Sequence, residues 1–251
     1  MKALVTGASS GIGRSFAYLL AGMGYDLILV ARRKKRLIAI KDSVDVNVKI
    51  FDMDISTTFN CHKLYNKVKK ENIDIVINAA GFGLIGEFTE TSLERELDMI
   101  DLNVKSLHTL TKLFLSDFVK KDKGSILNVA SIAAFQPGPL MATYYSTKSY
   151  VYNLTLSIYG ELKKQKSNVH ISCLCPGPVE TNFNNVANCE FSVKGLSSEY
   201  VANYAINKML KNKLLIIPGF SIKLLYIFGR LMPIRSKLNL TYNIQHAKRN
   251  N

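Results

Sequence analysis

Short apolar segments alternate with longer helical patterns along most of the chain, and this alternation restricts the possible folds more than any other feature. Several apolar segments carry no polar residue at alternate positions, which is typical of parallel strands buried on both faces. Strands that alternate with helices through short links predict right-handed crossovers and a three-layer, doubly wound α/β fold with about seven parallel strands. The expected strands are Ala3–Thr6, Leu27–Ala31, Val46–Phe51, Ile73–Asn78, Ser125–Ala130, Val169–Cys175 and Leu214–Ile217. The expected helices are Ile12–Gly22, Lys34–Lys41, Thr57–Lys70, Leu93–Val119 (one helix or two) and Thr143–Lys166.

Length and composition favour one globular domain. The 251 residues suffice for a single α/β domain over residues 1–251 and are few for two. The four cysteines lack the spacing of zinc ligands, so we interpret them as reduced thiols and expect no bound metal. We expect neither a signal peptide nor a spanning helix, because no apolar run reaches roughly 18 residues. The prediction is a cytoplasmic protein.

A group of glycines separates the first expected strand from the first expected helix. Gly7, Gly11 and Gly13 are spaced G-x-x-x-G-x-G. Glycine is needed where φ is positive or where a side chain would keep a ligand from the backbone. The following helix N-terminus favours a pyrophosphate. An ordinary glycine turn is the alternative, but the position between strand and helix favours a dinucleotide site. The expected contacts are Gly7, Ser9, Ser10, Gly11, Ile12 and Gly13.

A basic run follows the second expected strand, where many dinucleotide folds carry a carboxylate for the ribose 2′-hydroxyl. Here Ala31 is followed by Arg32-Arg33-Lys34-Lys35-Arg36. A carboxylate would repel a 2′-phosphate, whereas an arginine can bind it through two hydrogen bonds. A solvated basic loop is the alternative. The run predicts NADP(H) in preference to NAD(H), with Arg32 as the first candidate for the phosphate and Arg33 as the second.

The next two strands also end in residues suited to a ligand. Asp54 follows the third strand and could accept a hydrogen bond from an adenine amino group. The fourth strand is followed by a short segment of small residues. Ligands bind such sheets at the carboxyl ends of the strands. We therefore expect cofactor contacts from Asp54, Asn78, Ala79, Ala80 and Gly81.

Three residues with useful chemistry come later in the chain. Ser131 ends the fifth strand, Tyr144 lies thirteen residues further on, and Lys148 follows after four more. A helix places residues i and i+4 on one face, so the phenol and the ammonium can both face the cofactor. Each residue alone would more often be a cap or a surface side chain. Their joint order after a dinucleotide site favours a catalytic role.

The chain at this point resembles the short-chain dehydrogenase/reductase family, in its branch of roughly 250 residues. The motifs occur in the family's order and cover residues 1 to about 181. One departure is Ala79, where the family usually has asparagine. The matching motifs are T-G-x-x-x-G-x-G at Thr6–Gly13, N-x-A-G at Asn78–Gly81, Asn103, Ser131, Y-x-x-x-K at Tyr144–Lys148, and Pro176-Gly177 continuing to Thr181.

The resemblance implies a role for each matching residue. Tyr144 would protonate the nascent alkoxide as hydride arrives, or act as the base in the reverse direction. Lys148 would lower the phenol pKa and bind the nicotinamide ribose, and Ser131 would orient the substrate oxygen. Asn103 would hold a water that links the lysine to solvent, unless it only bends its helix. The nicotinamide would be bordered by Pro176, Gly177, Val179 and Thr181.

Simple electrostatics supports the tyrosine–lysine pair. A free tyrosine has a pKa of about 10, so catalysis near neutrality needs a shift of roughly 3 units, or about 4 kcal/mol. An ammonium about 4 Å away supplies ~4 kcal/mol at an effective dielectric constant of 20. Tyr145 is a competing phenol, but it does not match the motif.

Residues 182–200 follow the nicotinamide-side motif, and we expect them to form a mobile lid that selects the substrate. Apolar residues in this segment and in two other loops would line the substrate site, unless they belong to the core. These residues are Phe82, Leu84, Ile85, Phe135, Pro137, Leu140, Phe183, Val186, Phe191 and Leu196. They favour a lipophilic carbonyl or alcohol, such as a fatty acyl or steroid-like ketone.

Residues 218–251 form a C-terminal extension that is both apolar and basic. After Glu199 the chain has nine lysines and arginines and no acidic residue, within a formal net charge of +14. The charge suits an anionic membrane surface, an acidic carrier protein or simply solvent. The apolar segment Pro218–Pro233 is typical of a helix in a membrane interface, but it could also cover the core or form an oligomer interface. Nucleic acid is not expected, because no recognition motif accompanies the charge.

Three functional classes are compatible with these features. The first is a ketone or 3-oxoacyl reductase, and the second is an NADP-binding regulatory protein without turnover. The complete set of Ser131, Tyr144 and Lys148 argues against the second. The third, an epimerase or dehydratase, usually needs a larger substrate domain. The resemblance also implies a homodimer or homotetramer built on helices such as Val104–Lys120 and Thr143–Lys166.

Overall fold

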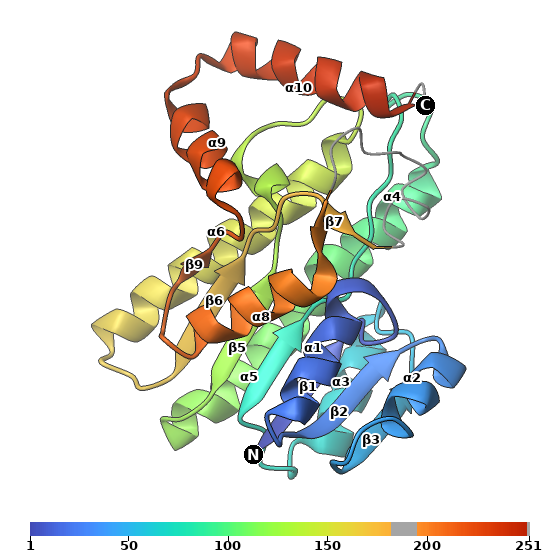
Figure 1. The fold of residues 1–251 in the computed structure, drawn as a ribbon, viewed down its shortest axis with the longest axis vertical. Coiled ribbons are helices and arrows are strands. Elements are labelled where there is room, and N and C mark those ends of the chain that lie inside the picture. The colour runs from blue at the N-terminus through green and yellow to red at the C-terminus, as the bar shows by residue number, and fades with distance from the viewer. Residues whose placement is uncertain (182–194, 250–251) are drawn as a thin grey trace.

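The centre of the computed structural model, which describes residues 1–181 and 195–249, is a seven-stranded sheet (Figure 1). Its strands are β1 (Lys2–Thr6), β2 (Asp26–Ala31), β3 (Val48–Asp52), β4 (Ile75–Asn78), β5 (Ser125–Val129), β6 (His170–Leu174) and β9 (Leu215–Ile216). The strand order is β3-β2-β1-β4-β5-β6-β9, and every pairing is parallel. The predicted fold class is confirmed.

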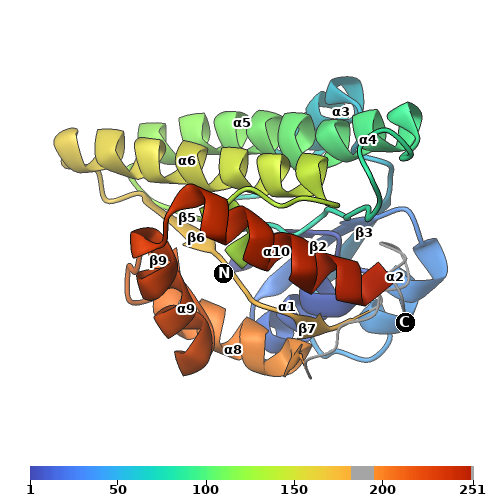
Figure 2. The same cartoon turned by 90° about the horizontal axis from the view of Figure 1, so that it is seen from above.

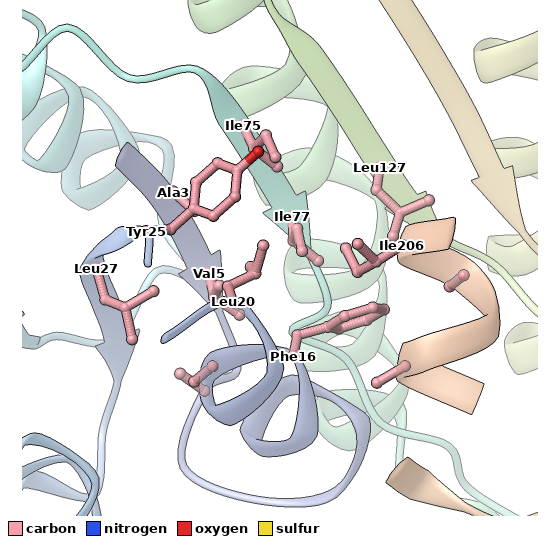
Figure 3. Close-up of a cluster of buried hydrophobic side chains, with 14 of the residues drawn as sticks. Ala3, Val5, Phe16, Leu20, Tyr25, Leu27, Ile75, Ile77, Leu127 and Ile206 are labelled. Atoms are coloured by element: carbon pink, nitrogen blue, oxygen red, sulfur yellow. The ribbon is translucent and has the colours of Figure 1, made fainter. Parts of the chain in front are cut away.

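The central residues of the strands are mostly apolar because the sheet carries a core on both of its faces. In β1, Ala3 and Val5 face one buried cluster, whereas Leu4 faces the other. The cluster on the first face includes Phe16 and Leu20 of the first helix (Figure 3). A strand that alternated polar and apolar residues would leave one of these cores without side chains.

Helices cover both faces of the sheet in two layers (Figure 2). One layer consists of α1 (Gly11–Gly22), α2 (Lys34–Lys41) and α8 (Ser198–Met209), whose apolar side chains join the first core. The other layer contains α3 (Thr58–Val68), α4 (Leu93–Ile100), α5 (Leu107–Lys121) and α6 (Ala142–Lys164). The expected helix Leu93–Val119 is two helices joined by the π-helical turn η1 (Asp101–Ser106).

Several short elements, and helix α8 (Ser198–Met209), were not predicted from the sequence. A short 3-10 helix, η2 (Ile132–Phe135), follows β5, and β7 (Val179–Glu180) pairs with β8 (Leu196–Ser197). Helix α8 begins at Ser198, so the last residues of the expected lid belong to regular structure. Residues 182–194 of that lid, with Phe183, Val186 and Phe191, lie outside the described residues.

The C-terminal extension forms two helices, α9 (Phe220–Leu231) and α10 (Ile234–Arg249), at the top of the view in Figure 1. Helix α9 contacts the domain through Ile222 and Tyr226. Helix α10 buries two polar side chains: Thr241 Oγ1 accepts from Gln136 Nε2 at 2.8 Å, and Gln245 Nε2 donates to Tyr145 Oη at 2.6 Å. Among the helices of the described residues, none combines the length and apolar character needed to cross a bilayer.

Candidate active site

A cavity of about 480 Å³ lies at the carboxyl ends of the strands. Strand order reverses between β1 and β4, and parallel sheets bind ligands at such a switch point. The loops after β1 to β6 all contribute to its wall. The predicted residues that line it are Gly7, Ser9, Ser10, Gly11, Ile12, Gly13, Arg32, Arg33, Asp54, Ala79, Ala80, Gly81, Ser131, Tyr144, Lys148, Pro176, Gly177, Val179 and Thr181.

The glycine loop has the backbone geometry that its sequence indicates. Gly7 and Gly11 have φ values of +67° and +53°, which favour glycine. A Cβ on Gly7 would lie 2.8 Å from the Cα of Ala80, and one on Gly13 would overlap the Gly7 carbonyl. The loop therefore packs against the turn after β4, and α1 begins at Gly11 beside the cavity. This cradle fits a dinucleotide pyrophosphate.

Thr6 connects the two turns, a role that the sequence interpretation did not assign. Its Oγ1 accepts hydrogen bonds from the backbone N–H groups of Ala79 and Ala80, at 3.1 and 3.2 Å. The residue is almost fully buried. Its hydroxyl thus holds the turn after β4 against the glycine loop. The sequence feature that could have indicated this role is the threonine directly before the first glycine.

Two arginines after β2 occupy the rim of the cavity in different ways. Arg33 Nη2 donates to Ser10 Oγ at 2.7 Å, and its Nε donates to Ser9 Oγ at 3.2 Å. Arg32 is exposed, and its Nη1 lies 3.6 Å from a carboxylate oxygen of Asp54. Burial, with repulsion from neighbouring arginines, lowers the pKa of Arg33 below its ordinary value. The rim is a cluster of like charges that an anion would neutralise.

The structure brings Ser131, Tyr144 and Lys148 together at the opposite end of the cavity. Lys148 lies one helical turn after Tyr144 on α6, and its Nζ is 5.8 Å from the centre of the phenol ring. The same Nζ donates to the carbonyl of Val129 at 3.0 Å. Ser131 Oγ accepts from the N–H of Ala133 at 3.1 Å, so it caps η2. A hydroxyl that accepts this bond can still donate its hydrogen to a substrate oxygen.

Lys148 is the most unusual ionisable group in the cavity. Its side chain is buried, and burial lowers its pKa to about 8. The nearby Cys173 and Cys175 act in the opposite direction. Below pH 8 the group therefore carries a positive charge in a dry environment, where its field is screened less than in water. This charge favours the deprotonated form of a nearby phenol.

Asn103 is buried, and its implied role of holding a water stays a prediction. It lies in the π-helical turn η1, a feature that is frequent at functional sites. Its amide donates to the Phe82 carbonyl and to Thr147 Oγ1, and its oxygen accepts from the Phe82 N–H. The side chain therefore joins the turn after β4 to α6 and does not line the cavity. Its contacts hold the backbone of Phe82, in the turn after β4, close to Lys148.

The side chain of Asn78 also lies away from the cavity. Its Nδ2 donates to Thr111 Oγ1 at 3.1 Å and to Asn128 Oδ1 at 2.9 Å, inside the domain. Asn128 in turn donates to Thr155 at 3.0 Å. The Asn78 side chain takes part in a buried polar network that connects β4 and β5 with α5 and α6. Polar groups this deep usually have such partners, whereas Asn78 Oδ1 is buried without one among the described residues. The expected contact of Asn78 with the cofactor stays a prediction.

Several cavity residues carry no motif that sequence reasoning could use. Tyr145, the phenol that does not match the family motif, is buried beside Tyr144, and burial raises its pKa to about 12. Its partner Gln245 comes from α10, one hundred residues later. Met141, Arg95 and Asp98 also line the wall. Only the tertiary arrangement brings these residues to the site.

The predicted apolar wall is correct in part. Phe82 lines the cavity, below the guanidinium of Arg95, and Ile85 packs with Met141 and Tyr144. Phe135 instead packs against Tyr226 of α9, with ring centres 4.3 Å apart. The expectation for Phe135 is wrong because η2 turns this side chain towards the C-terminal helices.

Known proteins are similar to this chain in both fold and sequence. A family model described as short chain dehydrogenase matches residues 1–190. An uncharacterised oxidoreductase of Staphylococcus epidermidis is 33% identical over 181 residues, 71% of this chain and 78% of that protein. A very-long-chain 3-oxoacyl-CoA reductase of Pyrenophora tritici-repentis is 34% identical over 184 residues, 68% of this chain and 53% of the fungal protein.

A solved structure extends the likeness into the C-terminal region. The short-chain dehydrogenase from Sphingobium yanoikuyae in complex with NADPH has a TM-score of 0.82 and 26% identity, and the match covers 94% of this chain and 96% of that one. Its central sheet and helices correspond to those described above. From the family match, the glycine cradle and the assembled Ser131, Tyr144 and Lys148, it follows that the chain belongs to the short-chain dehydrogenase family, oxidoreductases that act on alcohols or carbonyls with a nicotinamide cofactor.

Proposed function

We propose that the protein is an NADP(H)-dependent reductase that converts a lipophilic ketone or 3-oxoacyl group to a secondary alcohol. One observation carries the proposal: a single cavity extends from the arginine rim after β2 to Ser131, Tyr144 and Lys148. A nicotinamide dinucleotide is long enough to join two such ends, because its adenosine phosphate and its reactive ring lie at opposite ends of the molecule. The cofactor cradle and the proton donor would then serve one reaction.

The residues of the chain supply everything except the hydride, which a bound reduced nicotinamide provides. Ser131 donates a hydrogen bond to the substrate carbonyl and orients it. Tyr144 gives its proton to the same oxygen as negative charge develops there. Lys148, charged below about pH 8, stabilises the phenolate that remains. Asn103 keeps the turn after β4 and the start of α6 in register, and thereby holds the lysine in place.

The preference for NADP(H) is argued from the residues at the rim. Solved proteins of this fold carry NADPH or NAD, so the fold alone gives no preference. In this chain Arg33 is held by Ser9 and Ser10, directly above the glycine loop. Its planar guanidinium binds a phosphate better than it binds a neutral hydroxyl. We therefore assign the 2′-phosphate first to Arg33 and second to Arg32, the reverse of the order expected from the sequence.

The substrate class is argued from the cavity wall and from the fungal relative. Phe82, Met141 and Leu102 give the wall an apolar portion, and Met141 packs with Tyr144. A relative at 34% identity bears the name very-long-chain 3-oxoacyl-CoA reductase. Both support a carbonyl with a hydrocarbon chain or ring next to it.

The direct test is NADPH oxidation against a panel of ketones and 3-oxoacyl thioesters, with the wild type and Tyr144→Phe. We expect turnover of a lipophilic member of the panel, and a decrease of about 10²–10⁴-fold in the variant because it lacks the proton donor. Tight NADPH binding without turnover across the panel would instead support a regulatory protein. NADH serves as the cofactor comparison.

Assembly and location also remain proposals. The outer surfaces of α5 and α6 expose Val119 and Tyr150, and His108 Nδ1 lies 2.7 Å from Tyr150 Oη. These helices are the surfaces through which we propose a homodimer or homotetramer. We further propose a cytoplasmic location, with peripheral contact to the inner face of the membrane through the C-terminal extension.

A further inference from the structure

Helix α9 directs its most regular apolar face towards solvent. Phe220, Leu224, Ile227, Phe228 and Leu231 follow the spacing of one helical face, and their exposed fractions are 77%, 38%, 54%, 65% and 82%. On a helix of a water-soluble domain, residues with this spacing normally cover the core. A contiguous exposed apolar face of this kind marks a place where something else binds.

The opposite face of α9 is already in use, so the helix cannot simply roll inward. Ile222 and Tyr226 pack beneath it against Phe135 and its neighbours. Ile222 also lies so close to Gly177 that a Cβ on this glycine would be 2.8 Å from Ile222 Cδ1. Helix α9 is therefore apolar on two sides, and only one of them has a partner among the described residues.

Basic residues accompany the exposed face. Lys223 lies on α9, with its Nζ 5.6 Å from the ring centre of Tyr204. Arg235 and Lys237 follow on the first turn of α10. No acidic residue occurs anywhere after Glu199. The surface thus combines large apolar side chains with positive charge and offers no carboxylate to a partner.

We infer that α9 and the first turn of α10 form a docking surface for an anionic lipid bilayer. Helices that lie in a membrane interface combine these features, since apolar side chains enter the acyl region and basic ones remain near the headgroups. Two copies of the chain that met through this face would bring like charges together. Nucleic acid would use the charge, but it would leave Phe220 and Phe228 exposed to water.

The placement of α10 connects the docking surface with the cavity. Gln245 lies in the cavity wall, so the helix that follows α9 covers the substrate site. The consequence that a bilayer-dissolved ketone would enter beside α10 rests on the proposed function. The docking itself specifies the surface behind the proposed membrane contact and does not depend on the proposed reaction.

The test is vesicle flotation of the full chain, with phosphatidylcholine vesicles and with vesicles that also contain phosphatidylglycerol. We expect the protein to float with the anionic vesicles only, and to be released by added salt. Leu224→Ser with Phe228→Ser should abolish flotation. Arg235→Gln with Lys237→Gln should weaken it, because each basic residue near an anionic surface changes partition by roughly fivefold.

Matched variants control for a general loss of apolarity or charge. Phe59→Ser with Leu97→Ser changes two exposed apolar residues on α3 and α4. Lys120→Gln with Lys164→Gln removes two charges at the ends of α5 and α6. Both should float like the wild type. Tyr144→Phe should also float, so a failure of the proposed reaction would leave this result unchanged.

Three outcomes would overturn the inference. One is the absence of flotation with either vesicle. Another is flotation that survives the changes at Leu224 and Phe228, since charge alone would then explain it. The third is a dimer that these two changes dissociate without any effect on flotation, because a second copy would then cover α9.

Discussion

The dinucleotide-binding half of the molecule and its C-terminal helices distribute polar and apolar residues in opposite ways. In β1 and β4 the runs Ala3–Val5 and Ile75–Ile77 are apolar and buried. In α9 and α10 large apolar side chains such as Phe228 are exposed, whereas Thr241 and Gln245 are buried. The first arrangement makes a self-sufficient core. The second makes a layer that borders the cavity on one side and, as we infer, binds a lipid bilayer on the other.

The comparison shows that buried side chains have a different effect on the protein in each region. In the sheet, burial of apolar side chains drives folding. In α10, the buried amide of Gln245 contributes little net stability, because its hydrogen bond replaces one to water. What it supplies is a defined position for the helix above the cavity. The two regions therefore respond differently to substitution.

The largest effect should come from Lys148, where function and stability oppose each other. Lys148→Met removes the charge beside Tyr144, so we expect turnover to fall about a thousandfold. Burial lowers the pKa of Lys148, which means that the charged ammonium destabilises the folded state. The free energy of unfolding of the variant should therefore be about 1–3 kcal/mol higher than that of the wild type at neutral pH. Steady-state kinetics and denaturant unfolding of the cofactor-free protein measure the two effects.

The pH dependence of this gain provides an internal check. Lys148 has a folded pKa of about 8 and an ordinary value of 10.5. Below pH 8 it is charged in both states and the full destabilisation is present. Between 8 and 10.5 the unfolded chain holds more protons, so wild-type stability from this group rises with pH. The advantage of Lys148→Met should therefore shrink over that range, and a constant difference would contradict the assigned cause.

Arg33 should decide between the two cofactors. Arg33→Ala removes the guanidinium held by Ser9 and Ser10, and we expect kcat/KM for NADPH to fall by about 10–100-fold while that for NADH changes little. Arg36→Ala is the matched control, because it removes an equal charge from the neighbouring turn outside the cavity wall. Equal losses from the two variants would show that general charge matters, and not a phosphate contact at Arg33.

The same charge on Lys148 should shape the pH profile of reduction. The phenolate that Tyr144 becomes after giving up its proton is stabilised only while Lys148 is protonated, so kcat/KM for ketone reduction should decline as pH rises through about 8. Tyr145 contributes nothing to this profile, since its pKa of about 12 keeps it protonated throughout. A rate independent of pH across this range would argue against a charged Lys148 in catalysis.

Gln245 should have the smallest effect, and it probes the connection between the two regions. Gln245→Leu removes the donor to Tyr145 in the cavity wall, so we expect KM for the substrate to rise about tenfold with kcat little changed. Gln136→Leu removes the other buried contact of α10, to Thr241, outside the cavity. Its KM should stay near the wild-type value. If both variants raise KM equally, α10 acts only as a cover.

Much of the active site could be read from the order of local motifs. Gly7, Gly11 and Gly13 lie in one turn, and Tyr144 and Lys148 lie on one helix, so their geometry depends on neighbouring residues alone. Parallel strands then bring the separate turns to one edge, which is why Ser131 joins them. The roles of Asn78 and Asn103 were not accessible in this way. Their side chains turned towards partners on α5 and α6, and sequence spacing does not reveal such partners.

The sequence by itself determined the alternation of strands and helices, the glycine turn after β1 and the placement of Tyr144 and Lys148 on one helical face. These properties follow from the period of apolar residues, the freedom of glycine and the pitch of a helix, all of which act over a few residues. Only the tertiary structure decided that Gln245 reaches Tyr145, that Arg33 contacts Ser10, and that α9 presents its apolar face outward. Those contacts join residues that are far apart in the sequence, so they depend on which surfaces pack together in the folded chain. Local sequence patterns do not predict which surfaces these are.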